Sequence, residues 1–278
     1  MRDDKPNWPS GLGLLAIHVG ALAVFVPTFF SWRAVAAGAI IAYVTGAIGI
    51  TLCYHRTLAH RSIRLRKPLE YLAAALGALA FQGDPISWVA THRVHHATSD
   101  TQEDPHTTLR GFAWAHFEWL YKANPNVPVS REEYRKLCPD LWNDRYYRML
   151  AYMHIPMQIA LAGLLYAIGG WPFVVWGVFG RLIFTYHTTW FVNSATHMFG
   201  YRTFKTADRS TNSWWVALLS FGEGWHNNHH AFPYSARHGL AWYEIDLTWW
   251  VIRGLRLLRL ADKVRLPSTA VRERLLSR

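Results

Sequence analysis

Long apolar stretches separate the polar segments of this chain of 278 residues. Residues 11–32 and 34–54 contain no Asp, Glu, Lys or Arg, and each reaches the length of about 20 apolar residues that crosses a bilayer. A longer uncharged run, 149–180, is interrupted by Gly-Gly-Trp-Pro at 169–172, which is typical of a turn. The pattern predicts an all-α membrane protein with four transmembrane helices, at about 11–32, 34–54, 149–169 and 172–192.

A secretory signal peptide is an alternative interpretation of the first apolar stretch. Its apolar part is longer than the 7–15 residues typical of a signal core, and a second span begins at Ala34, almost directly after it. We therefore expect a permanent membrane helix at 11–32.

The polar segments 55–148 and 193–278 are expected to form a helical cap, so that the whole chain, 1–278, is one domain. Leu69–Ala80 is too short for a crossing and is expected to be a buried or interfacial helix. Residues 124–140 favour a loop with one short amphipathic turn. Asp246–Arg265 interleaves apolar residues with arginines and suits a helix in the headgroup layer, although an ordinary solvated helix face explains it nearly as well.

Charge placement predicts the orientation in the membrane. All but four of the 29 lysines and arginines lie in 54–148 and 193–278, many of them close to the ends of the expected spans. By the positive-inside rule, both termini and the cap are cytoplasmic. The net charge of +11 is explained by an anionic leaflet, and nothing in the sequence resembles a nucleic-acid-binding module.

Histidines are concentrated in three short motifs in or next to the predicted cap. Imidazole is the commonest protein ligand for iron, zinc and copper, and one ion rarely takes more than about six protein donors. A lone histidine is usually a hydrogen-bonded core residue, which is our interpretation of His18, His154 and His187. The clustered histidines are too many for one ion and suit two; they are His55-x4-His60, His92-x2-His95-His96, His226-x2-His229-His230, and His197, which follows Asn193 at a spacing of four.

Helical spacing indicates how these motifs present their side chains. Residues three and four apart share a helix face, whereas the step of five from His55 to His60 separates them by about 140°. We therefore expect the helix to unwind there, or the site to approach from between the two. Because His55 and His197 follow directly on predicted spans, the metal site is expected just outside the cytoplasmic leaflet.

Acidic residues near the motifs are candidates for orienting the imidazoles, because ligating histidines usually donate their other ring nitrogen to a carboxylate or carbonyl. The candidates are Asp100, Glu103, Asp104 and Glu223. Surface solvation explains the first three equally well.

The amino-acid sequence of the motifs resembles that of the integral-membrane fatty acid desaturases, specifically the Δ9 (stearoyl-type) branch and its bacterial, cyanobacterial and plant members. The resemblance extends from about Thr51 to Trp250. The segments that carry it are HRTLAHRS (55–62), WVATHRVHH (88–96), SDTQEDPH (99–106), NSATHMFGYR (193–202) and GEGWHNNHHAFPYSARHG (222–239).

The resemblance implies four transmembrane helices under a cytosolic cap that holds a di-iron site. It implies O2-dependent insertion of a cis Δ9 double bond into a saturated C16 or C18 acyl chain, with electrons from an external ferredoxin or cytochrome b5-type carrier. The two irons would be held by His55, His60, His92, His95, His96, His197, His226, His229 and His230, with Asn193 contributing through a water.

The resemblance also suggests substrate contacts: Gln82, Trp88, Thr189 and Trp190 match positions that line the bend of the acyl tunnel, although interfacial anchoring explains the two tryptophans as well. The polar residues that contact coenzyme A in the animal enzymes are replaced here by Gly83, Ala90 and Thr91. Family naming slightly favours an acyl-CoA substrate, and an acyl-lipid stays open.

Two points remain open at the sequence level. Arg181, inside the fourth predicted span, has a possible role near the substrate headgroup together with Tyr186 and His187. As to function, a membrane hydroxylase or monooxygenase would use similar histidine motifs. A metal transporter is a further alternative, but transporters place polar ligands near the bilayer midplane, and these motifs lie outside the spans.

Overall fold

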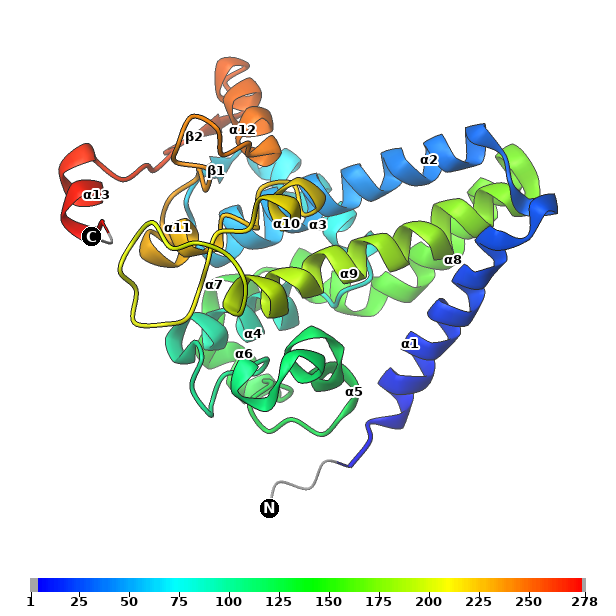
Figure 1. The fold of residues 1–278 in the computed structure, drawn as a ribbon. Helices are drawn as coiled ribbons and strands as arrows, with labels where there is room; N and C mark the ends of the chain where they lie inside the picture. Colours follow the sequence, from blue (N-terminus) through cyan, green and yellow to red (C-terminus); the bar gives the residue numbers. More distant parts are fainter. Residues whose placement is uncertain (1–4, 277–278) are drawn as a thin grey trace.

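The computed structural model describes residues 5–276 and is mostly helical. Long helices form an elongated bundle at one end, and shorter helices form a cap at the other end (Figure 1). The described strands are β1 (Arg64–Leu65) and β2 (Ala261–Asp262), which pair antiparallel and join the segment after the second long helix to the C-terminal part of the cap.

Three helical stretches are long and apolar enough to cross a membrane: Trp8–Phe25, Trp32–Ala59 and Arg145–His197. The first contains α1 (Trp8–Ala21) and the short η1 (Leu22–Phe25), followed by η2 (Pro27–Phe29). It begins before the predicted Gly11 because the side chain of Asn7 caps the helix and Pro9 fits its first turn. It ends well before Trp32, at Val26, where the backbone becomes extended.

The third stretch reverses direction at the predicted glycine pair. Helix α8 (Arg145–Val174) has non-helical backbone at Gly169 and Gly170, the latter with φ of +68°, which glycine adopts readily. The chain after this break, η6 (Val175–Gly180) and α9 (Arg181–Ser194), packs back along α8. Residues 145–197 are therefore a helical hairpin, which continues into η7 (Ala195–His197).

The second stretch changes its helix type before it reaches the cap. Helix α2 (Trp32–Tyr43) is α-helical, and η3 (Val44–Ala59) continues it with π-helical hydrogen bonds between residues five apart. The last such bond runs from the amide of His60 to the carbonyl of His55, at 3.1 Å. The helix thus extends beyond the predicted end at Tyr54.

The cap is built from short helices around the end of η3. Predicted helix 69–80 is present as α3 (Lys67–Leu79), whose small residues pack tightly against η3. Residues 124–140 are more helical than expected, because Ser130 and Glu133 form a capping box that starts α6. The remaining elements are α4 (Pro85–Thr98), η4 (Thr108–Arg110), η5 (Trp114–Glu118), α5 (Trp119–Tyr121), α6 (Arg131–Leu137), α7 (Pro139–Trp142), α10 (Trp214–Leu219), α11 (His226–Ala231), α12 (Leu247–Leu257) and α13 (Thr269–Leu275).

Candidate metal centre

The histidines of the three motifs and His197 gather into two adjacent groups at the junction of the bundle and the cap. Within each group, one ligating atom of every residue lies within 4.8 Å of those of the others. The first cluster is His55, His60, His92, His96 and His229, and the second cluster is His95, His197, His226 and His230.

Helix geometry distributes the motifs between the two clusters. On α4, His92 and His96 are four residues apart and both face the first cluster, whereas His95 faces the second. On α11 the assignment is reversed: His226 and His230 face the second cluster and His229 faces the first. The expectation that each motif presents one shared face is therefore too simple, because each of these helices lies between the clusters and contributes to both.

The π-helical turn accounts for the step of five between His55 and His60. In η3 residues five apart lie nearly one above the other, and the two imidazole rings are 4.7 Å apart between centroids. The helix does not come apart between the two residues. It widens, and this brings both imidazoles to one cluster.

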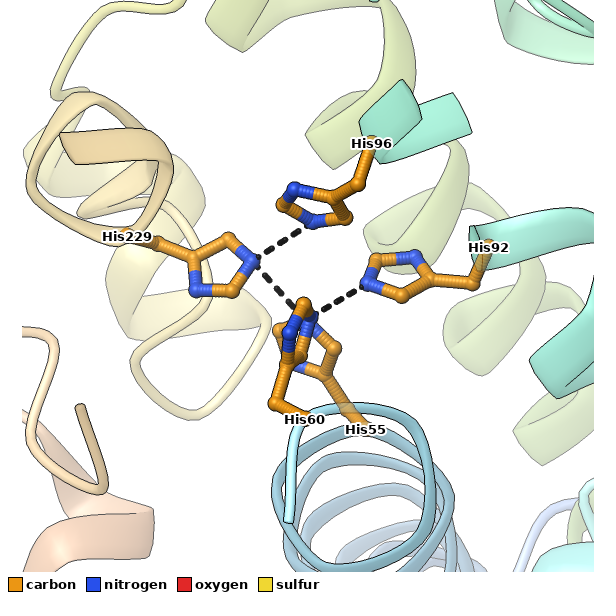
Figure 2. A group of neighbouring side chains, drawn as sticks. All are labelled: His55, His60, His92, His96 and His229. Atoms are coloured by element: carbon orange, nitrogen blue, oxygen red, sulfur yellow. Dashed lines mark hydrogen bonds between the residues drawn. The ribbon is translucent and has the colours of Figure 1, made fainter. Parts of the chain in front are cut away.

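The ring nitrogens of the first cluster converge from three elements (Figure 2). Nε2 of His229 lies 3.1 Å from Nε2 of His55 and 2.9 Å from Nε2 of His96. Nε2 of His60 and Nε2 of His92 are 2.7 Å apart. In the second cluster, His226 and His197 approach to 3.0 Å, and His95 and His230 to 3.4 Å, again between Nε2 atoms.

Four of these five separations fit nitrogens that share a metal ion, and the fifth, between His60 and His92, is slightly shorter. Two imidazole nitrogens at about 2.0–2.1 Å from one ion, with angles of roughly 90–110° at the metal, lie about 2.9–3.4 Å apart. The donor set is entirely imidazole, which suits iron, zinc, copper or nickel. The residues present therefore fit two metal ions in adjacent sites.

Burial keeps most of these imidazoles neutral, as metal ligation requires. It lowers the pKa of five of these histidines well below the usual value, and it lowers that of His230 to about 4. His95 differs: burial lowers its pKa, but the neighbouring Asp104 carboxylate outweighs this and raises it. The five histidines with strongly lowered pKa are His60, His92, His96, His226 and His229.

Four carboxylates lie against the opposite nitrogen, Nδ1, of imidazoles in the two clusters. In the second cluster, His95 is paired with Asp104 at 3.0 Å. His197 pairs with Asp100 and His230 with Asp208, each at 2.8 Å. In the first cluster, His55 lies 2.7 Å from Glu223. Such pairs fix the tautomer, so that Nε2 offers its lone pair to a metal.

Three of the predicted acidic residues thus orient imidazoles, and Glu103 does not take part, since it is exposed to solvent. Asp208 was missed by sequence analysis, because it lies outside the motifs. The Asp208 carboxylate accepts a hydrogen bond from the amide of Ser210 at 3.0 Å, and this bond holds the loop that carries Asp208.

His238 is a second residue that sequence analysis did not single out. Its Nδ1 lies 3.1 Å from Oε2 of Glu223, and its ring centroid is 4.5 Å from that of His229. It lies in the same sequence segment as the third histidine motif, eight residues after His230. This short separation was the sequence feature that could have identified His238 as part of the site.

A narrow, mostly apolar cavity extends from the two clusters between η3, α4 and α9. Trp88 and Thr189, two of the predicted substrate contacts, line it, and so does Asn193. Gln82 lies beside it and donates to the hydroxyl of Thr189 at 3.0 Å. Metal-cluster residues at its wall are His55, His92, His95 and His226.

Trp190 lies elsewhere. It is buried against the first long helix, where it stacks on His18 and on Tyr186. His18 and His187 are hydrogen-bonded to each other, with their Nε2 atoms 3.3 Å apart, as expected of core histidines. Trp190 therefore packs α1 against α9, on a side of α9 different from the one that faces the cavity.

Arg181 does not line the cavity either. It is buried inside the bundle, where it donates to the carbonyl of Gly177 at 2.9 Å, to the carbonyl of Leu79 at 2.6 Å and to the amide oxygen of Gln158 at 2.8 Å. These hydrogen bonds connect neighbouring helices. They do not support the hypothesis from the sequence that Arg181 contacts the substrate headgroup.

The fold and the site define a helical protein with apolar membrane-length helices and two adjacent polyhistidine clusters next to a narrow cavity. The sequence profile of the fatty acid desaturase family matches residues 30–261. The chain belongs to this family of enzymes.

Similar proteins differ in acyl carrier and in double-bond position. An sn-1 stearoyl-lipid 9-desaturase of Anabaena variabilis is 52% identical over 260 residues, covering 94% of each chain. A palmitoyl-monogalactosyldiacylglycerol delta-7 desaturase of Arabidopsis thaliana is 47% identical, covering 94% of this chain and 70% of the relative. An icosanoyl-CoA 5-desaturase of Limnanthes douglasii is 46% identical, covering 94% and 73%.

Proposed function

We propose that this protein is an O2-dependent acyl-lipid desaturase that inserts a cis double bond at C9 of a saturated C16 or C18 chain. The observation that carries the proposal is the pair of carboxylate-supported histidine clusters at the wall of a narrow apolar cavity. In the balanced reaction, one O2, two electrons and two protons convert a saturated carbon pair into an alkene and two waters.

The proposed cofactor is two iron ions, one in each cluster. Bound iron would supply the reduction of O2 and the removal of hydrogen from the acyl chain, since protein side chains alone cannot perform this chemistry. The chain's own residues fix the positions of the ligands. Asp100, Asp104, Asp208 and Glu223 hold one nitrogen of an imidazole and direct the other into a cluster. Asn193, at the cavity wall, is the proposed water-mediated ligand.

The cavity wall would select the carbon atoms that react. Trp88 stacks on the ring of His92, with centroids 5.0 Å apart, so an acyl chain against its indole would lie beside the first cluster. Thr189 is held by Gln82 on the opposite wall. Because a displacement of about 1 Å can cost about a hundredfold in rate, such rigid contacts would determine the double-bond position.

A glycerolipid is the proposed acyl carrier. Ala90, on the buried side of α4, is fully enclosed in the core, so its side chain offers no contact to a coenzyme A headgroup. The most extensively covered of the relatives above is named as acting on stearoyl-lipid, which supports the same choice.

We also propose four membrane crossings, with the hairpin at Gly169–Gly170 separating the third from the fourth. Both termini and the cap would be cytoplasmic, because the lysines and arginines flank the cap side of the spans. Electrons would come from an external ferredoxin or cytochrome b5-type carrier.

Expression in a desaturase-deficient host tests the proposal. We expect monoenes with the double bond at C9, first in the glycerolipid fraction after a pulse of labelled fatty acid. Labelled monoene that appears first as acyl-CoA would exclude a glycerolipid as the acyl carrier and would leave the desaturase reaction unaffected. Hydroxy acids as the main product would instead indicate a hydroxylase, and metal flux without any change in lipids would indicate a transporter.

A further inference from the structure

Helix α12 has one apolar face in the core and a second apolar face that is exposed. On the inner face, Thr248 and Ile252 are fully buried, and Ile252 packs in a core cluster that includes Leu52 of η3. On the outer side, Trp250 is 55% exposed and Leu257 84% exposed. A helix in a purely aqueous setting would carry polar residues on the outer face.

The depth of α12 along the bundle coincides with the expected membrane surface. Its Thr248 hydroxyl is hydrogen-bonded to the hydroxyl of Thr51, at 2.5 Å. Thr51 stands nineteen residues after Trp32, where the second membrane-length helix begins. At 1.5 Å per residue, this is at most about 28 Å, close to the hydrocarbon thickness of about 30 Å. In Figure 1, α12 runs across the direction of α2, as a helix in the membrane plane would.

Positive charge lies beside the exposed apolar face. Arg253 and Arg256 are exposed on α12, and Arg259 and Lys263 follow the end of the helix. The acidic residues next to it are engaged elsewhere, since Asp246 is buried against Arg56 and Asp262 is paired with Arg64. The surface is therefore complementary to an anionic layer.

Exposed aromatic residues also lie in the segment that leads into α12. Trp242 and Tyr243 precede the helix, and Trp242 is 92% exposed. Tryptophan and tyrosine favour the headgroup level of bilayers, where the ring is buried and its polar group stays hydrated.

We infer that α12, together with Trp242 and Tyr243, is a membrane-docking surface that lies in the headgroup layer of an anionic leaflet. It fastens the cap to the bilayer at the level where η3 leaves the membrane. The inference rests on the proposed placement of the spans and is independent of the reaction that the metal centre performs.

An environment-sensitive fluorophore on an introduced cysteine tests this surface in nanodiscs of phosphatidylcholine and phosphatidylglycerol. The native Cys53 and Cys138 are buried, so labelling is directed to the introduced site. The test position is Leu257→Cys. The membrane control is Ile40→Cys, on the exposed side of α2, and the aqueous control is Glu132→Cys, on the exposed side of α6.

We expect lipid-borne nitroxides to quench the labels at positions 257 and 40, and aqueous iodide to quench the label at 132. The inference would be overturned if iodide quenches the label at position 257 as strongly as the label at 132, while lipid-borne nitroxides still quench the label at position 40. Iodide access at position 40 as well would overturn the proposed span placement, and the inference with it. Protection at 257 that needs an added acidic carrier protein would reassign the surface to protein docking.

The arginines provide a second readout. The double variant Arg253→Gln/Arg256→Gln is expected to reduce lipid quenching at position 257 in anionic nanodiscs and to leave it unchanged in neutral ones, since each basic residue near an anionic surface adds attraction. The matched control is Arg131→Gln/Arg135→Gln on α6. Equal quenching in the double variant and the parent protein would show that no electrostatic attachment exists.

Discussion

Nδ1 of His55 lies 2.7 Å from Oε2 of Glu223, and this contact joins the first cluster to a buried charge network. The other oxygen of Glu223 accepts from Arg56 at 3.0 Å, and Arg56 also donates to Asp246 at 2.9 Å. Asp246 in turn caps α12. Contacts therefore connect His55, a proposed metal ligand, through a buried ion pair to the start of α12.

Glu223→Gln is expected to weaken metal binding in the first cluster. The neutral amide removes the negative charge that lies beside Nδ1 of His55 and of His238 and accepts from Arg56, and loss of such a supporting partner typically costs about 10–100-fold in metal affinity. Iron titration of the purified protein measures the effect. The control is Glu103→Gln, which alters an exposed carboxylate. Identical iron affinity in the Glu223 variant and the parent would refute the assigned role.

Asp208→Asn addresses the second cluster alone. Its carboxylate holds His230 at 2.8 Å and lies outside the network around Arg56. We expect about a 10–100-fold loss of affinity for one of two irons, while the other is retained. A spectroscopic titration that resolves two binding steps measures this. Weakening of both steps to the same extent would argue against separate clusters.

Arg181→Ala is expected to destabilise the bundle. The truncation leaves the amide oxygen of Gln158 buried without its donor, at about 1–3 kcal/mol for such an unsatisfied group, whereas the carbonyl of Leu79 still accepts from Gln158. The melting temperature in detergent should fall, while the folded fraction keeps its iron. Arg33→Ala, which removes an exposed arginine, serves as the control. If both variants melt like the parent, the hydrogen bonds of Arg181 contribute nothing to stability.

Asp140 gives the cap a predictable dependence on acid. Burial raises the pKa of this carboxyl, but hydrogen bonds from Arg93 and Arg61 outweigh burial and lower the pKa to about 2. A carboxyl with a lowered folded-state pKa stabilises the fold above its unfolded pKa of about 3.9 and loses this effect as the pH falls towards 2. The contribution is at most about 2 kcal/mol, reduced by solvent screening.

The measurement compares metal-free parent protein with Asp140→Asn, so that loss of metal does not contribute. We expect the parent to be more stable at pH 6 and the difference to shrink between about pH 4 and pH 2. A difference that stays constant through this window would show that ionisation of Asp140 is not its source.

His229→Ala is expected to abolish monoene formation while membrane insertion stays intact. Its Nε2 lies close to those of both His55 and His96, so its loss removes a proposed ligand of the first cluster. His154→Ala is the control, because His154 is a bundle histidine whose Nδ1 is bonded to the carbonyl of Ala151. Full activity of the His229 variant in a desaturase-deficient host would exclude His229 from the ligands.

The positions of the clustered histidines and the apolar helices were predictable, because both depend on local spacing. Their distribution between two clusters was not: spacing indicates which face His95 occupies, but not that α4 lies between two sites. The π-helical turn before His60 also escaped prediction. The five-residue step required a distortion there, yet it did not specify a widened helix.

Residues that act through tertiary contact were the hardest to predict. Asp208 reaches His230 across a loop, and no local pattern near Asp208 signals this pairing. Trp190 was assigned by resemblance to the acyl tunnel, whereas in the fold it packs against α1. Which side of α9 faces the cavity depends on how the bundle packs, and that information is spread over several helices.

The most direct test of two separate metal sites is the iron content of the purified protein, measured together with its Mössbauer spectrum. We predict two irons per chain in two distinct histidine-rich environments, falling to about one in His229→Ala and remaining at two in His154→Ala. A parent protein that binds no more than one ion per chain under iron-replete conditions would contradict the account.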